Sequence, residues 1–129
     1  MLRAMDARRQ GRGRAAEARG LAAEATCAAV LVRAGFAVLG RRVRTGAGEI
    51  DLVARHGDLT IIVEVKARPG AAEAAFAISP RQRTRLVAAT EALMAKEPGW
   101  FGDGLRFDAM FVAGDGAVHW LEDAFRPGD

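Results

Sequence analysis

The sequence predicts a mixed α/β domain with one central sheet flanked by helices. Its 129 residues suit a single domain with one hydrophobic core. Residues 49–54 and 59–67 are rich in valine, isoleucine and leucine and are separated by a short polar connection, which is typical of a β-hairpin. Residues 15–34 are mostly strong helix formers. The order of helix, three strands, helix and two strands, without an internal repeat, indicates helices packed on one sheet.

Local signals bound the elements in the first half of the chain. Residues 1–14 are rich in arginine and glycine and are predicted to form a disordered basic tail. The helix over residues 15–34 is expected to stop at Gly35. A strand over residues 36–44 then leads through a turn at residues 45–48 into the hairpin.

A second helix follows the hairpin. A loop or an irregular helix is expected over residues 71–78. Ser79 is the predicted N-cap and Pro80 the first helical residue, because each is favoured at that position. The helix is expected to continue to about residue 96 and to be broken by the Pro-Gly pair that follows.

Two further strands complete the predicted domain. They are expected at residues 105–112 and 117–121, on either side of a glycine-rich turn. Asp108 is predicted to have a structural role, as a cap or as the partner of an arginine. The domain is thus expected to span residues 15–125, followed by a short C-terminal tail at residues 126–129.

The composition disfavours several kinds of site. Cys27 is the single cysteine, so neither an intrachain disulfide nor a cysteine metal cluster can form. We expect it to be a small buried thiol. His56 and His119 lack the spacing of zinc ligands. The net charge of +3 and a pI near 10 favour polyanionic partners such as nucleic acid.

The sequence gives no sign of a membrane or secretory segment. No apolar run approaches the roughly 20 residues that a membrane helix needs. The N-terminal residues lack the apolar block of a secretory signal. We therefore expect a cytoplasmic protein without membrane contact.

The two hairpin strands carry charged side chains among their apolar residues. Because successive strand residues point to opposite faces, Glu64 and Lys66 share one face of their strand. Whether Asp51 on the neighbouring strand meets Glu64 depends on the hairpin register. An even connection, such as residues 55–58, places the carboxylates opposite or diagonal to each other, and a slip of one residue separates them. The alternation assigns four residues to the core on the face opposite these charges: Ile50, Leu52, Val63 and Val65.

Carboxylates gathered in this way favour a bound cation, because they repel each other and lose hydration. Asp51 and Glu64, with water and phosphate oxygens, would suit Mg²⁺ (or Mn²⁺). Lys66 beside them would orient a water molecule or stabilise charge on a scissile phosphate. The pattern therefore predicts metal-assisted hydrolysis of phosphodiesters. A simple ion pair between Glu64 and Lys66 on a solvated sheet face is the alternative.

The first predicted helix supplies a third carboxylate. Glu24 shares a stripe with Cys27 and Leu31, on the face that should pack against the sheet. Its side chain is expected either at the edge of this packing or directed toward the cation site. Gly20, one turn earlier, would permit a close approach to the helix, although fraying is a simpler explanation.

Basic and polar residues form two candidate contacts with phosphate. One is the start of the second helix, where backbone N–H groups and positive side chains favour anions. The other is the strand before the hairpin. The candidate nucleic-acid-binding residues are Arg81, Gln82, Arg83, Arg41, Arg42 and Arg44. An ordinary exposed helix start and a solvated strand edge are equally consistent with the pattern.

Several of these segments together resemble the UPF0102 (YraN-like) family. The segments that carry the resemblance are Glu24, Gly35-Phe36, GEIDLVA at 48–54, VEVKAR at 63–68, Ser79-Pro80-Arg81-Gln82 and Arg106-Phe107-Asp108. The family is similar in turn to archaeal Holliday junction resolvases, which have the restriction-endonuclease-like fold and the PD-(D/E)xK motif. The chain departs from the family pattern where Arg41-Arg42-Val43-Arg44 replaces Arg-Asn-aromatic-Arg, and where Ala23 replaces glycine before Glu24.

The resemblance implies roles for individual residues. Asp51 and Glu64 would be metal ligands, Glu24 the helix carboxylate near the metal, and Lys66 the catalytic lysine. Gln82 matches a position where the family commonly has lysine and related nucleases have glutamine. Because the related resolvases act as dimers, the resemblance also suggests a homodimer.

Three functions follow as hypotheses. The first is a Mg²⁺-dependent DNA endonuclease that acts on branched or recombination intermediates. The second is a non-catalytic nucleic-acid-binding or recruitment module that retains the nuclease fold. The third is a structural or protein-interaction domain.

Overall fold

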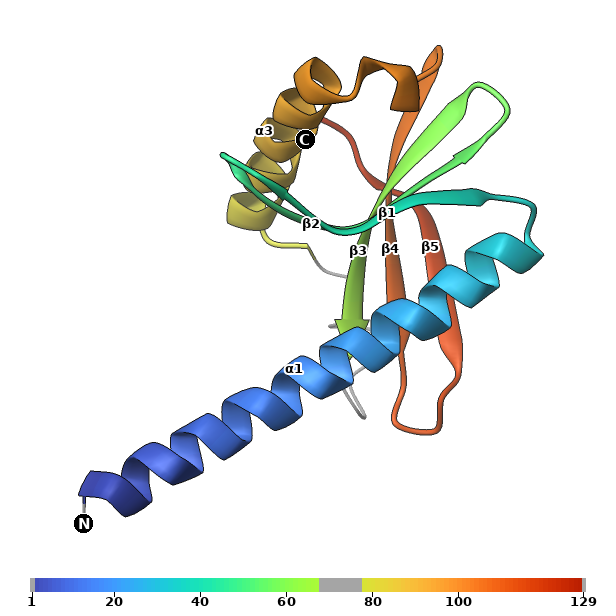
Figure 1. Ribbon diagram of the computed structural model, residues 1–129. Helices are drawn as coiled ribbons and strands as arrows, with labels where there is room; N and C mark the ends of the chain where they lie inside the picture. The colour runs from blue at the N-terminus through green and yellow to red at the C-terminus, as the bar shows by residue number, and fades with distance from the viewer. Residues whose placement is uncertain (1, 68–77, 129) are drawn as a thin grey trace.

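The computed structural model describes residues 2–67 and 78–128, and for residues 2–13, 15 and 16 it describes the backbone alone. Its five strands form one mixed sheet in the order β1-β2-β3-β4-β5, with α1 on one face and α3 on the other (Figure 1). The elements are α1 (Leu2–Arg33), β1 (Ala37–Thr45), β2 (Gly48–His56), β3 (Leu59–Ala67), α3 (Pro80–Lys96), the 3₁₀ turn η1 (Pro98–Trp100), β4 (Gly104–Val112) and β5 (Val118–Phe125). The predicted α/β architecture is confirmed, and it is that of a restriction-endonuclease-like fold.

Helix α1 ends as predicted but begins earlier. Gly35 adopts a left-handed conformation with φ +96°, and the Phe36 N–H donates to the Leu31 carbonyl at 3.0 Å, which closes the helix. At the other end the helix starts at Leu2, whereas a disordered tail was predicted for residues 1–14. Most residues of this stretch are good helix formers, although its glycines and arginines favoured disorder in the sequence. The N-terminal half of α1 extends beyond the sheet (Figure 1).

Helix α3 begins with the predicted cap. The Ser79 hydroxyl accepts from the Gln82 N–H at 3.2 Å, and the Gln82 side-chain oxygen accepts from the Ser79 N–H at 3.1 Å. These two bonds form a capping box, and Pro80 occupies the first turn. The loop or irregular helix predicted for residues 71–78 lies outside the described residues, except for Ile78.

The hairpin of β2 and β3 has an even connection, shorter than predicted. His56 pairs with Leu59, so the turn consists of Gly57 and Asp58 alone, and Gly57 adopts φ +59°. The same register pairs Leu52 with Val63, where the ladder of paired residues ends. Extended by one residue, this register sets Asp51 directly opposite Glu64, one of the two arrangements that bring the carboxylates together.

The core occupies both faces of the sheet, which differs from the expectation of one apolar and one charged face. Leu52 and Val63 pack beneath α1, together with Leu31 of that helix. Ile50, by contrast, belongs to the cluster beneath α3. Ile50 and Leu52 were expected to share a face, and that prediction is wrong. Leu52 still pairs with β3, whereas Ile50 lies beyond the last pair, where β2 has left β3.

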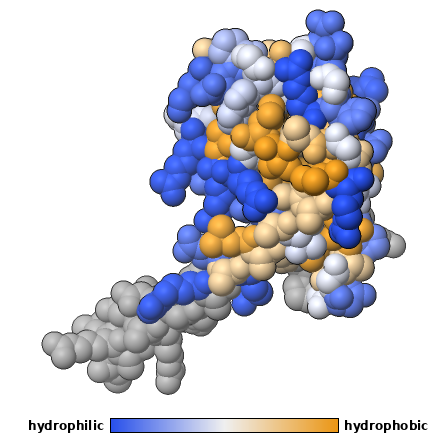
Figure 2. All heavy atoms as spheres, turned by 45° about the vertical axis from the view of Figure 1, so that its right-hand side comes forward, coloured by the Kyte–Doolittle hydropathy of each residue, from blue (hydrophilic) through white to orange (hydrophobic). Residues whose placement is uncertain are grey.

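Helix α1 covers its face of the sheet with one stripe of apolar side chains. Cys27, Ala28 and Leu31 are fully buried against the strands, which confirms the buried thiol. Burial of a leucine of this kind stabilises the fold by about 2 kcal/mol. Figure 2 shows the alanine-rich part of α1 as a pale orange band, with hydrophobic atoms gathered beside it.

Asp108 joins β4 to the edge strand β5. Its buried carboxylate accepts two hydrogen bonds from the Arg106 guanidinium, both at 2.8 Å. It also accepts from the Trp120 indole N–H at 2.9 Å and from the Asp123 N–H at 3.0 Å. This network spans the irregularity in the β4–β5 pairing between Phe107 and Ala109. The structural role predicted for Asp108 is confirmed.

The described part of the chain has no helix that combines the length and the hydropathy needed to cross a membrane.

Replacement of Asp108 by alanine should destabilise the fold. The change leaves the Arg106 guanidinium and the Trp120 N–H without their carboxylate acceptor. The loss of one partner of a buried ion pair costs about 3–5 kcal/mol. Urea unfolding should show this loss of free energy. Asp103→Ala, at an exposed position, is the matched control and should change it by less than about 0.5 kcal/mol. Equal stability of the two variants would contradict the role assigned to the network.

Candidate functional site

The candidate site lies where β2 and β3 separate. Beyond the Leu52–Val63 pair, the Asp51 carboxylate accepts the Val65 N–H at 2.8 Å, so a side-chain oxygen takes the place of a backbone carbonyl. β2 nevertheless stays paired with β1 to its end, and this hairpin reaches toward α3 (Figure 1). The sheet therefore forks at Asp51.

Glu64 and Lys66 stand on β3 next to the fork. Glu64 is buried, and the Lys66 Nζ lies 3.6 Å from its Oε1. The two side chains are only 9% and 10% exposed, which excludes a solvated ion pair. The ion pair is largely shielded from solvent, so few water molecules compete with it.

Glu24 reaches the same region from α1. Its carboxylate is buried and is paired with Arg42 of β1, with Nε 3.3 Å from Oε1 and 3.2 Å from Oε2. The Arg42 Nη1 also lies 3.3 Å from Oε1 of Glu17, on the same face of α1. Arg42 therefore links β1 to α1 through ion pairs. The sequence had predicted it to contact phosphate.

Burial and mutual repulsion shift the pKa values of the acids. Burial, followed by the charge of Glu64, raises the pKa of Asp51 to about 7, and the Val65 N–H opposes this shift. Burial also raises the pKa of Glu24, although Arg42 opposes it, and the charge of Asp51 adds to the increase. Burial and the two carboxylates raise the pKa of Cys27 to about 12, so its thiol is inert.

The donor set suits a hard divalent cation. Asp51 and Glu64 offer carboxylate oxygens on neighbouring strands, and Mg²⁺ commonly takes one or two carboxylates together with water and phosphate oxygens. In the described residues as they stand, no three His, Cys, Asp or Glu side chains converge closely enough to hold a metal ion. Glu24, held by Arg42, is thus a neighbour of the two strand carboxylates and not yet part of a three-ligand group.

The predicted nucleic-acid-binding residues are placed differently from one another. Arg81 and Arg41 are exposed, and Arg44 is exposed with Glu49 at 3.7 Å. Gln82 is part of the capping box. Arg83 donates to the Ile78 carbonyl at 2.8 Å, which fixes its side chain.

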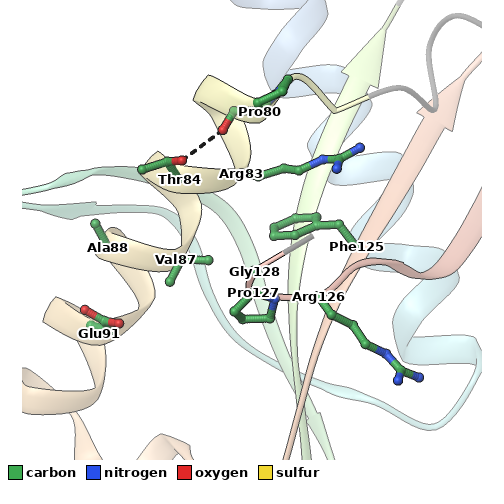
Figure 3. A pocket seen from close by; sticks show the side chains of 10 residues that line it. All are labelled: Pro80, Arg83, Thr84, Val87, Ala88, Glu91, Phe125, Arg126, Pro127 and Gly128. Carbon is green, nitrogen blue, oxygen red and sulfur yellow. Dashed lines mark hydrogen bonds between the residues drawn. The ribbon is translucent and has the colours of Figure 1, made fainter.

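Arg83 lines a cavity that is separate from the carboxylates of the candidate site. This cavity of about 430 Å³ lies between α3 and the C-terminal segment, and its lining includes none of Asp51, Glu64, Lys66 or Glu24. Figure 3 shows the Arg83 side chain extended over the Phe125 ring, 5.8 Å from its centroid. Arg83 therefore stabilises the packing of β5 against α3.

Two functional contacts were not found by sequence reasoning. Arg42 pairs with Glu24, and Gly20 lies beside its guanidinium, where a Cβ would be 3.7 Å from Nη2. The glycine was the available signal, since it suggested a close approach to α1. Arg85 packs on Gly48, whose Cβ would lie 3.0 Å from the Arg85 Cγ. This contact brings a cationic side chain of α3 to the β1–β2 hairpin.

The Asp51→Asn variant should be more stable than the parent protein at neutral pH. Because the folded state raises the pKa of Asp51 from 3.8 to about 7, the folded protein retains a proton that the unfolded chain releases. This contribution to stability is complete below about pH 4 and is lost as the pH rises to about 7. The variant should therefore gain on the order of 2 kcal/mol relative to the parent across this range.

Urea unfolding at several pH values without divalent cations would measure this difference. Asp103→Asn, at an exposed position, is the control and should parallel the parent. A stability difference for Asp51→Asn that does not change with pH would contradict the assigned environment.

Comparison with known proteins agrees with the resemblance seen in the motifs. The model of a family described as "Uncharacterised protein family UPF0102" matches residues 23–112. A UPF0102 protein of Azorhizobium caulinodans is 50% identical over 114 residues, which are 88% of this chain and 87% of that protein. One of Granulibacter bethesdensis is 48% identical over 115 residues, 89% of this chain and 73% of that protein. A third, of Acidiphilium cryptum, is 44% identical over 122 residues, 95% and 94% of the two chains. The chain therefore belongs to the uncharacterised protein family UPF0102.

Proposed function

We propose that the protein is a Mg²⁺- or Mn²⁺-dependent DNA endonuclease that hydrolyses phosphodiester bonds. The observation that carries the proposal is the environment of Asp51. Its carboxylate is partly buried beside Glu64, and among the described residues no cationic side chain forms an ion pair with it. A carboxylate in this position has a pKa near neutrality and becomes fully ionised when a cation binds.

The residues at the fork would divide the chemistry among them. Asp51 and Glu64 would supply oxygen ligands, and a bound Mg²⁺ would neutralise charge on the phosphate and make its water ligand more acidic. The Lys66 ammonium group donates hydrogen bonds, so it can hold the attacking water or stabilise a phosphate oxygen. Glu24 lies close enough to contribute a further oxygen or to hold a water molecule.

The duplex would be held by basic residues around the β1–β2 hairpin and the start of α3. Arg85 approaches this hairpin, and Arg81 and Arg44 are exposed near the ends of the same two elements. Phosphate contacts of this kind position DNA without reading its sequence. Branched or recombination intermediates as substrates, a homodimer and a cytoplasmic location are further parts of this proposal.

A non-catalytic nucleic-acid-binding module is the second candidate. It is favoured by the pairing of two acids with cations of the chain itself, Glu24 with Arg42 and Glu64 with Lys66. Such a protein would bind DNA through its arginines and would keep the acids as structural ion pairs.

Cleavage of DNA separates the two candidates. With Mg²⁺ or Mn²⁺, the protein should cut a labelled four-way junction or flap, and Asp51→Asn and Glu64→Gln should each lower the rate below about one hundredth. Lys66→Met should act in the same direction. All three variants should still bind the DNA. Cleavage that survives both carboxylate changes would refute the proposed site, and binding without cleavage under either metal would favour the second candidate.

Arg85→Ala should weaken DNA binding without removing the metal site. The loss of one phosphate contact should lower affinity by about three- to tenfold and reduce the slope of log K against log salt by about 1. Fluorescence anisotropy over a range of NaCl concentrations would measure both quantities. Arg33→Ala, exposed at the end of α1, is the matched control of equal charge. Equal salt slopes for the two variants would exclude Arg85 from the interface.

A further inference from the structure

We propose that Arg42 competes with a divalent cation for Glu24. Its guanidinium pairs with Glu24 while no metal is bound and releases this carboxylate when a divalent cation binds at the site. The inference rests on the proposed metal site at Asp51 and Glu64. It assigns to Arg42 the control of metal affinity, in place of the phosphate contact predicted from the sequence.

The backbone of Arg42 adopts an unfavourable conformation, which indicates that its contacts hold it in place. Its φ of +47° lies in the left-handed region, which is costly for a residue with a long side chain. Arg42 stands in β1 between Arg41, which pairs with Leu52, and Val43, which pairs with Ile50. It is therefore the residue of β1 that faces Asp51 in the register. Such a conformation persists only where the surrounding contacts hold it, and the contacts of Arg42 are acidic.

One face of α1 presents two carboxylates to the guanidinium. Glu17, Gly20 and Glu24 are spaced by three and four residues, so they lie on one face of the helix. The guanidinium contacts both glutamates and passes beside Gly20, where a Cβ would lie at van der Waals distance, 3.7 Å from Nη2. Arg42 is thus seated along α1, with Glu24 at the end that is directed to the sheet.

The charges at the fork are balanced pair by pair. Glu24 is neutralised by Arg42 and Glu64 by Lys66, whereas Asp51 accepts a backbone N–H. With these partners in place, the three acids do not converge in a group that could hold a metal ion. Release of Glu24 from the guanidinium would supply a third carboxylate.

A competition between cations follows from this geometry. The guanidinium contacts both carboxylate oxygens of Glu24, and its positive charge also repels a divalent ion at the neighbouring carboxylates. Arg42 should therefore stabilise the metal-free protein and weaken metal binding. A fixed positioning residue would have the opposite effect on affinity, because its removal would disorder a metal ligand.

The test uses the full chain, freed of metal, and four variants. Arg42→Asn removes the guanidinium and suits the backbone, since asparagine tolerates positive φ better than most residues. Arg42→Lys retains the charge. Arg33→Asn removes an exposed arginine from the end of α1 and is the matched control. The double variant Glu24→Gln/Arg42→Asn removes both partners.

Mn²⁺ affinity, from the electron paramagnetic resonance signal of free Mn²⁺, and the Tm with and without Mn²⁺ are the readouts. Arg42→Asn should bind Mn²⁺ about tenfold more tightly than the parent, as expected for one removed charge near a partly desolvated site. Its metal-free Tm should be lower and its rise on Mn²⁺ addition larger. Arg42→Lys should stay close to the parent, and Arg33→Asn should match it. The double variant should lose the gain in affinity.

Two results would overturn the inference. If the parent binds Mn²⁺ and Arg42→Asn binds it equally or more weakly, Arg42 does not compete with the metal, and the proposed metal site itself stands. If neither the parent nor any variant binds Mn²⁺, the metal site is wrong and the inference fails with it.

Discussion

The candidate site depends on the point at which the β2–β3 ladder ends. After the Leu52–Val63 pair the two strands diverge, and the Val65 N–H would lack a partner inside the protein. The Asp51 carboxylate accepts this N–H, so one side chain both terminates the ladder and stands at the fork. The direction of the β1–β2 hairpin, the approach of Gly48 to Arg85 and the proximity of Asp51 to Glu64 all follow from this arrangement.

The buried Asp108 and the partly buried Asp51 have very different surroundings. Asp108 accepts four hydrogen bonds, two of them from the Arg106 guanidinium, and the network satisfies its charge. Asp51 accepts a single backbone N–H, and burial together with the charge of Glu64 raises its pKa to about 7. Desolvation without compensation is a cost to stability that structural residues avoid. The contrast supports a structural role for Asp108 and a functional role for Asp51.

Arg42 and Lys66 set the remaining charge at the fork. Each pairs with a buried glutamate, and each comes from a strand that borders Asp51 or Glu64. Paired acids tolerate burial in the absence of a metal, so the fold can be stable before a ligand binds. The left-handed backbone of Arg42 adds a local cost at the same place, as is common where a site is held ready for a ligand.

Much of the fold could be predicted from local sequence, because the signals there are short-range. Ser79 and Pro80 predicted the start of α3, and Gly35 the end of α1, since caps depend on a few adjacent residues. The hairpin and the even number of residues in its connection followed from the apolar strands and the polar segment between them, although the turn has two residues instead of four. In the same way the alternation of charged and apolar residues brought attention to Asp51 and Glu64.

The faces of the sheet and the partners of the charges could not be predicted in this way. Leu52 pairs with β3 and packs under α1, whereas Ile50 lies beyond the end of this ladder and packs under α3. Strict alternation cannot express this separation of the strands. Arg42 and Glu24 are 18 positions apart in the sequence, and Arg83 and the Phe125 ring that it covers are further apart still. The sequence by itself determined which elements form and which acids are candidates. The tertiary structure decided which cation each acid meets, because a long side chain pairs with whatever charge the packing of helix and sheet brings within its reach.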